Sequence, residues 1–147
     1  MKVQIKILNK KLEQVPKYAT EGSAGLDLRA CIDEPIKISP KNVDLIPTGI
    51  ALYLMHDETA GLILPRSGLG HKKGLVLGNL VGLIDSDYQG EILISAWNRS
   101  SKDIRIEPMD RIAQLVIVPI KKVDFVLKEE FEETGRAKKG FGSSGYT

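Results

Sequence analysis

The sequence predicts an all-β fold, a sandwich or barrel of short antiparallel strands in a single domain. Short apolar runs recur along the chain, and each is bounded by Gly, Pro, Asn or Asp, which favour turns. No segment sustains an apolar stripe at helical spacing for long enough to form a packed helix. With 147 residues, of which 42% are hydrophobic, the chain can bury one sizeable core.

The expected strands follow one another with short connections. The first, residues 3–7, alternates between apolar and polar side chains. The others are expected at residues 36–38, 50–54, 62–64, 80–84, 91–98, 104–106, 112–118 and 123–127. Residues 80–84 and 91–97 are expected to form the two arms of one β-hairpin. Single helical turns are expected at residues 57–60 and after Ser67, with Ser67 as the N-cap.

The character of the chain changes after residue 127. Residues 128–135 are acidic, and residues 136–147 are rich in Gly, Ser and Lys without core-forming periodicity. We therefore expect a β-barrel core domain at residues 1–127 and a mobile C-terminal arm at residues 128–147.

Charge and cysteine content limit the partners. Lys and Arg total 21 against 19 for Asp and Glu, a balance that excludes a dedicated nucleic-acid scaffold and favours a small ligand if the partner is an anion. No apolar run approaches the roughly 18 residues of a membrane-spanning helix, so no membrane partner is expected. Cys31 is the single cysteine, and no secretory leader follows Met1. Both observations favour a reducing, cytoplasmic location.

The glycine-rich tail has two open interpretations. Residues 140–145 match G-x-G-x-x-G, but only two residues follow, so no helix can open there and a Rossmann site is excluded. The backbone N–H groups of this segment could wrap an anion, with Arg136 nearby and Phe141 as a stacking surface. The alternative is a frayed, solubilising C-terminus.

Two internal segments carry groups suited to phosphate chemistry. Residues 65–70 place Arg66, Ser67 and flexible backbone amides after an apolar strand, which is phosphate-binding chemistry or an ordinary tight turn. Asp85 stands where a strand ends, as a turn former or as a catalytic base. Residues 85–90 resemble the start of a calcium loop, but the twelfth position is Ala96, which excludes an EF-hand.

Five segments together resemble the motifs of the trimeric dUTPase family, in the right order along nearly the whole chain. They are SAGLDLRA at 23–30, PRSGLG at 65–70, GNLVGLIDSDYQG at 78–90, RIAQL at 111–115 and RAKKGFGSSG at 136–145. The resemblance implies a jelly-roll-like, distorted antiparallel β-barrel and a homotrimer with shared active sites. It also implies Mg²⁺-dependent hydrolysis of dUTP to dUMP and pyrophosphate, by attack of water on the α-phosphorus. That activity limits uracil incorporation into DNA and supplies dUMP for dTMP synthesis.

The resemblance also assigns roles to individual residues. Asp85 activates the attacking water, and Tyr88 packs against the sugar. The uracil edge is read by Asn79, Leu83, Ile84 and Leu93. The phosphates are held by Arg66, Ser67, Gly68 and Gln114, and a lid formed by the tail covers the nucleotide with Arg136, Phe141, Ser143 and Ser144. The metal has no direct protein ligand, and Asp27 reaches it through water.

The chain departs from the family motifs at two positions, and two alternative functions stay open. Ala137 and Lys139 replace glycines of the fifth motif, which changes lid closure but, we predict, leaves activity intact. One alternative is a catalytically idle dUTP-binding regulatory module. The other is a relative of dCTP deaminase, whose chemistry needs a glutamate on the second arm of the hairpin, where this chain has Ser95.

Overall fold

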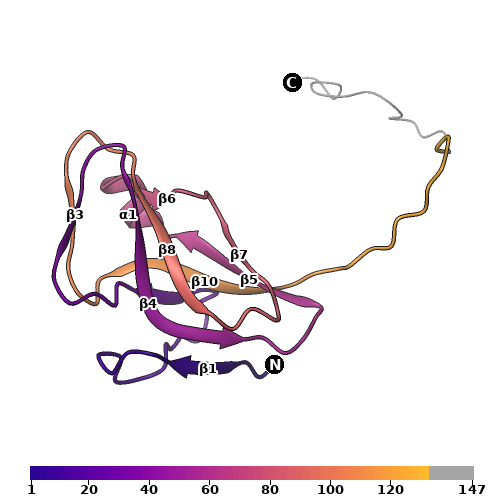
Figure 1. The fold of residues 1–147 in the computed structure, drawn as a ribbon, viewed down its shortest axis with the longest axis horizontal. Coiled ribbons are helices and arrows are strands. Elements are labelled where there is room, and N and C mark those ends of the chain that lie inside the picture. The colour runs from indigo at the N-terminus through magenta and orange to yellow at the C-terminus, as the bar shows by residue number, and fades with distance from the viewer. Residues whose placement is uncertain (133–147) are drawn as a thin grey trace.

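The computed structural model describes residues 1–132, and it confirms the all-β prediction. Within these residues, two four-stranded sheets and one two-stranded sheet pack around a single apolar core, with one short helix at the side (Figure 1). The core side chains come from both larger sheets, as in a sandwich whose inner faces carry every second residue of each strand.

The first sheet has the order β1–β4–β8–β6, and every neighbouring pair is antiparallel. Its strands are β1 (Gln4–Ile7), β4 (Val43–Tyr53), β8 (Glu91–Asn98) and β6 (Leu75–Leu77). β8 alternates strictly between buried and more exposed side chains, which shows why its period-2 pattern could be recognised in the sequence.

The second sheet has the order β2–β10–β5–β7, also antiparallel. Its strands are β2 (Leu26–Arg29), β10 (Arg111–Pro119), β5 (Thr59–Pro65) and β7 (Gly82–Ile84). β10 lies between β2 and β5, so it connects segments that are far apart in the sequence. Of the four phosphate-site residues expected from the sequence, Gln114 lies on this sheet, and Arg66, Ser67 and Gly68 follow directly after its strand β5.

The remaining elements are short. β3 (Ile36–Ile38) pairs with β9 (Ile104–Ile106) in the two-stranded sheet. The helix α1 (Ser67–Lys72) follows β5. Its N-cap is Arg66, in an extended conformation, and no side chain caps the helix. The prediction of Ser67 as N-cap is therefore wrong: Ser67 is the first helical residue, because β5 ends directly before Arg66 and sets where the helix can begin.

Several expected strands are confirmed, whereas others have different bounds or were not expected. The strands at 36–38, 91–98 and 104–106 have the expected bounds. The expected strand at 50–54 is the end of the longer β4, the one at 80–84 is shortened to β7, and β2 and β6 were not among the expected strands. The helical turn expected at 57–60 is wrong, because Thr59 and Ala60 already pair with β10.

The expected hairpin of residues 80–84 and 91–97 is also wrong. β7 pairs with β5, whereas β8 pairs with β4 and β6 in the other sheet. The connection crosses between the sheets, and on the way Ser86 O accepts a hydrogen bond of 3.2 Å from Leu54 N. A local hairpin between β7 and β8 competes here with the longer pairing of β4 and β8. The β4–β8 pairing provides hydrogen-bond partners for more backbone groups than a hairpin with the three-residue β7 could.

The strand expected at 123–127 does not form. β10 already has a neighbour on each side, and the last backbone bond of this region joins Ile120 N to Glu58 O at 2.8 Å. Figure 1 shows the chain then leading away from both sheets. Val123, Phe125 and Leu127 are 66, 95 and 98% exposed. High strand propensity is not sufficient, because a strand forms only where its backbone pairs with a neighbouring strand.

Candidate active site

The second sheet brings three of the five motif segments together. Gln114 of β10 lies opposite Asp27 of β2 on one side and opposite Leu64 of β5 on the other. Arg66 follows β5 directly. Because β10 is the central strand of these three, the first, second and fourth motif segments meet at one place on the outer surface of the sheet.

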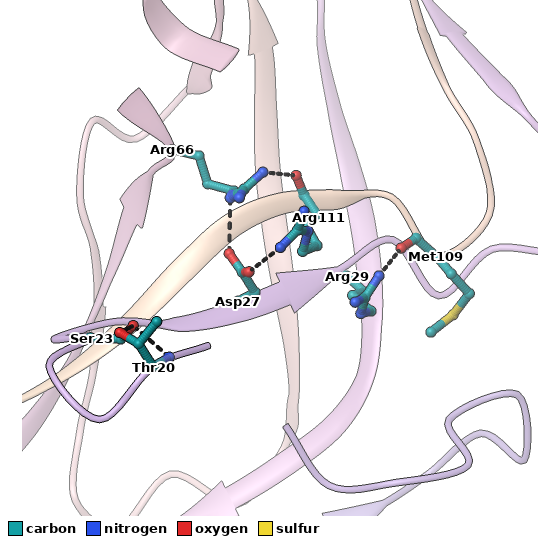
Figure 2. A network of polar contacts seen from close by, with 7 residues as sticks. All are labelled: Thr20, Ser23, Asp27, Arg29, Arg66, Met109 and Arg111. Atoms are coloured by element: carbon teal, nitrogen blue, oxygen red, sulfur yellow. Dashed lines mark hydrogen bonds and ion pairs between the residues drawn. The ribbon is translucent and has the colours of Figure 1, made fainter. Parts of the chain in front are cut away.

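Asp27 is the centre of a polar network at this place. Its Oδ1 lies 2.8 Å from Arg66 Nε, and its Oδ2 lies 3.2 Å from Arg111 Nη1. Arg66 Nη1 also donates a hydrogen bond of 3.3 Å to the backbone oxygen of Arg111. Figure 2 shows the two guanidinium groups meeting the same carboxylate, Arg66 from the end of β5 and Arg111 from β10. The Asp27 side chain is 24% exposed, so this network is partly shielded from solvent.

Gln114 is held beside the network. Its Nε2 donates a hydrogen bond of 3.0 Å to Pro65 O, which ties β10 to the end of β5. A Cβ placed on Gly25 would lie 2.7 Å from Gln114 Oε1, so a side chain at that position would displace the amide. The glycine of the first motif segment therefore leaves room for the glutamine of the fourth.

These residues line a cavity of about 430 Å³. Its other walls are the start of α1 and the loop before β2. The first turn of a helix has N–H groups without an intrahelical acceptor, and here they belong to the segment of Ser67 and Gly68. The lining residues are Ala19, Ser23, Ala24, Gly25, Asp27, Arg66, Ser67, Gly68, Arg111 and Gln114. Guanidinium, amide and backbone N–H donors around one cavity are the groups that bind phosphate.

Asp85 and Tyr88 lie on the segment that crosses between the sheets. Tyr88 N donates to Asp85 O at 3.2 Å, and Tyr88 Oη donates to Glu91 O at 3.0 Å. The tyrosine ring lies where a Cβ of Gly90 would be, so a larger residue there would displace the ring. Asp85 itself is exposed. The turn thus holds Tyr88 in a defined place close to the exposed Asp85.

The expected uracil-reading residues lie near this turn. Gly78 N donates to Ser95 O at 2.8 Å, which places the following Asn79 beside β8, the strand that carries Leu93. Asn79, Leu83 and Leu93 are exposed, whereas Ile84 is half-buried. Three of the four residues expected to read the uracil edge therefore lie on the surface of the chain, where a ligand can reach them.

Asp85 is remote from the cavity of Arg66 in the same chain. Ile84 lies opposite Gly61, so Asp85 is at the beginning of β5, whereas Arg66 follows its end. Gly61 and Arg66 are five residues apart, which at about 3.3 Å per residue is a separation of roughly 16 Å. One chain does not bring Asp85 to the cavity of Arg66.

The remaining expectations concern the tail and the metal. Arg136, Phe141, Ser143 and Ser144, and the departures at Ala137 and Lys139, lie outside the described residues.

Within residues 1–132 no group of three or more His, Cys, Asp or Glu side chains could hold a metal ion. In the same part of the chain, no helix is long and apolar enough to cross a membrane.

Sequence reasoning missed Arg111 as a residue of the cavity. It belongs to the fourth motif segment, but only Gln114 of that segment was expected to act. Its contact with Asp27 depends on strand pairing, so the one available signal was its position in a motif that already contained a phosphate-site residue.

The structure shows an all-β protein with a cavity on a sheet surface that is lined by donors suited to phosphate, and comparisons with known proteins specify the family. The dUTPase family model matches residues 12–145. Deoxyuridine 5'-triphosphate nucleotidohydrolase of Coxiella burnetii is 62% identical over 146 residues, covering 97% of this chain and 96% of the relative. The enzyme of the same name from Polynucleobacter asymbioticus is 58% identical, covering 99% and 98%. The chain belongs to the dUTPase family.

Solved structures agree with this assignment. Staphylococcus bacteriophage 80alpha dUTPase with dUpNHpp has a TM-score of 0.87 at 31% identity, covering 98% of both chains. A mutant dUTPase from phage phi11 of S. aureus, described as revealing the coordination of a structural Mg(II) ion, has a TM-score of 0.81 at 25% identity. That match covers 90% of this chain and 100% of the phage chain.

Proposed function

We propose that this protein hydrolyses dUTP to dUMP and pyrophosphate, limiting uracil incorporation into DNA and supplying dUMP for dTMP synthesis. The observation that carries this function is the cavity in which Arg66, Gln114 and Asp27 meet, because three separate motif segments of the family converge there. The family membership and the high identity to named nucleotidohydrolases support the same activity.

The active form is a homotrimer with sites shared between subunits. Asp85 and Arg66 are too far apart in one chain to act on the same phosphate, so a site needs groups from different chains. The surface supports self-association. Val43 and Leu45 of β4 and Leu93 of β8 are exposed apolar residues of the first sheet, and residues 123–127 are equally uncovered.

The two residue groups have complementary tasks. Arg66, Ser67, Gly68 and Gln114 of one subunit bind phosphate oxygens. Asn79, Leu83, Ile84 and Leu93 of another subunit form the uracil slot. Tyr88, fixed through its hydroxyl on Glu91 O, packs against the deoxyribose and excludes a ribose 2′-hydroxyl. Because the donors and acceptors of the slot are fixed, cytosine cannot form the hydrogen bonds that uracil forms. Because the slot is narrow, it excludes the methyl group of thymine.

Asp85 acts on the water. Its carboxylate accepts a hydrogen bond from the attacking water and directs the oxygen to the α-phosphorus. As the new oxygen–phosphorus bond forms, the proton passes to Asp85 and the bond to the pyrophosphate oxygen breaks. Arg66 neutralises the charge that develops on the phosphate oxygens.

Mg²⁺ is the expected cofactor, and the residues of the cavity fit it only indirectly. Among residues 1–132, Asp27 is the one carboxylate that lines the cavity, and two arginines engage it, so these lining residues do not form a metal cage made of protein ligands. Mg²⁺ commonly binds through substrate phosphates and keeps most of its waters, and Asp27 can hold such a water. When bound, the ion supplies charge neutralisation on the triphosphate.

We further propose the organisation expected from the sequence. Residues 1–127 form the core domain, and residues 128–147 form an arm whose Arg136, Phe141, Ser143 and Ser144 close over the nucleotide of a neighbouring subunit. Cys31 is buried and is the single cysteine, which supports a cytoplasmic location.

The first test is pyrophosphate release from dUTP, dTTP, dCTP and UTP in parallel, with Mg²⁺ and with a chelator. Metal-dependent release from dUTP alone is the expected result. Asp85→Asn should keep nucleotide binding and lose most turnover. Unchanged turnover in that variant would mean that another group activates the water. Binding of dUTP without hydrolysis by the unmodified chain would favour the idle regulatory module, and ammonia release from dCTP would favour the deaminase.

A further inference from the structure

A β-bulge in β10 brings Arg111 to the phosphate cavity. Gln114 lies opposite Asp27, but the register shifts beyond Ala113 and leaves Ile112 without a partner. In a regular strand Arg111 would point to the same side as buried Ala113. With the extra residue, Ile112 and Ala113 both face the core, and Arg111 shares the outer face with Asp27 and Gln114. Bulges of this kind redirect single side chains next to functional sites.

The redirected side chain meets Asp27 on the oxygen that Arg66 does not use. Arg111 Nη1 lies 3.2 Å from Oδ2, and Arg66 Nε lies 2.8 Å from Oδ1 (Figure 2). The carboxylate therefore has one arginine on each oxygen. Without Arg111, the remaining pair of Asp27 and Arg66 would be neutral. With it, the three side chains carry a net positive charge, which suits a cavity for a polyanion.

The same arrangement determines which donors Arg66 has left. Its Nε is engaged by Asp27 and its Nη1 by the backbone oxygen of Arg111, so Nη2 and the second hydrogen of Nη1 are available for phosphate. A phosphate that draws Arg66 away weakens its pair with Asp27. Arg111 keeps that carboxylate neutralised and in place, so the anionic substrate does not face an uncompensated negative charge.

We propose that Arg111 is a positioning residue for phosphate binding, and that it acts through Asp27 rather than on the substrate. This inference rests on the proposed function, since it concerns the site that holds the triphosphate. Arg111 uses a single nitrogen on the carboxylate, so a lysine ammonium can replace it. Arg66 contacts two acceptors with two nitrogens, a geometry that lysine does not reproduce.

The test compares steady-state kinetics of dUTP hydrolysis in Arg111→Met, Arg111→Lys, Asp27→Asn and the Asp27→Asn/Arg111→Met double variant. Loss of one charge-assisted contact predicts a KM about 10-fold higher for Arg111→Met, with kcat changed less than about threefold. Arg111→Lys should stay within about threefold of the unmodified KM. In the Asp27→Asn background, Arg111→Met should have no further effect on KM, because the group through which it acts is already changed.

Arg29→Met is the matched control. Arg29 lies opposite Arg111 in the β2–β10 register and donates to Met109 O at 2.8 Å, but within residues 1–132 no hydrogen bond or ion pair joins its side chain to Asp27. Its removal from the same sheet edge should leave the KM for dUTP unchanged. Thermal melting of every variant detects a loss of fold, and Arg111→Gln replaces Arg111→Met in the comparison if the methionine variant does not fold.

Three outcomes would overturn the inference. A 10-fold effect of Arg111→Met that persists in the Asp27→Asn background would show direct phosphate binding. If Arg111→Lys and Arg29→Met raised the KM for dUTP as much as Arg111→Met does, and their melting temperatures fell, the role of Arg111 would be purely structural. An unchanged KM in Arg111→Met would show no role. If the unmodified chain binds dUpNHpp but hydrolyses no dUTP, the proposed activity fails, and the same comparisons made on the Kd of dUpNHpp still decide the role of Arg111.

Discussion

Two inactive variants of this chain should restore activity when they are assembled together. Asp85 lies beside the start of β5 and Arg66 follows its end, roughly 16 Å apart along a strand that rises about 3.3 Å per residue. A site built within one chain could not use both groups on one phosphate. We therefore expect Asp85→Asn chains and Arg66→Ala chains, each nearly inactive alone, to complement one another.

The magnitude follows from random assembly of equal amounts of the two chains. Half of all Asp85 positions and half of all Arg66 positions are then intact. A site that takes them from different subunits has both with a chance of about one quarter, so the mixture should show about 25% of the activity of the unmodified protein. The assay is pyrophosphate release after co-refolding, with mixed trimers verified by native mass spectrometry.

A mixture of Arg66→Ala and Gln114→Ala chains is the control. Both residues line the same cavity of one chain, so every cavity in that mixture has a defect and no activity should return. Verified mixed trimers of Asp85→Asn and Arg66→Ala without recovered activity would refute the shared site. Recovery in the control mixture would show that the cavity is not contributed by a single chain.

Three further predictions concern individual positions. Asn98→Ala leaves Ile38 O, Lys102 O and Ser100 N without the buried partner they now have, so the free energy of unfolding should fall by about 3 kcal/mol in denaturant titrations. Gly25→Ala should raise the KM for dUTP several-fold in the hydrolysis assay, because its Cβ displaces the Gln114 amide. Burial, with the nearby charge of Glu91, raises the pKa of the Cys31 thiol above its ordinary value of 9.0. An unfolded thiol then loses its proton at lower pH than the folded one, so this group leaves stability unchanged below about pH 9 and lowers it as pH rises further. A thiol reagent at neutral pH should label Cys31 only after unfolding.

Local pattern was a good guide wherever one face of a strand is buried and the pairing is simple. β8 and the β3–β9 pair have the predicted bounds because their alternating side chains record which face meets the core. β2 was not recognised as a strand because its alternation of apolar and polar side chains extends over only four residues, Leu26–Arg29. Residues 123–127 show the reverse error, since within residues 1–132 this apolar segment pairs with no other strand.

The sequence by itself determined the fold class, the family and the chemistry that each motif can supply, because these depend on residue types and their order. Tertiary structure decided which of those motifs meet. The central position of β10 joins Asp27, Arg66 and Gln114 in one cavity, and the bulge at Ile112 adds Arg111. The length of β5 separates that cavity from Asp85. Strand order, register and bulges are set by contacts between residues distant along the chain, and local spacing does not contain them.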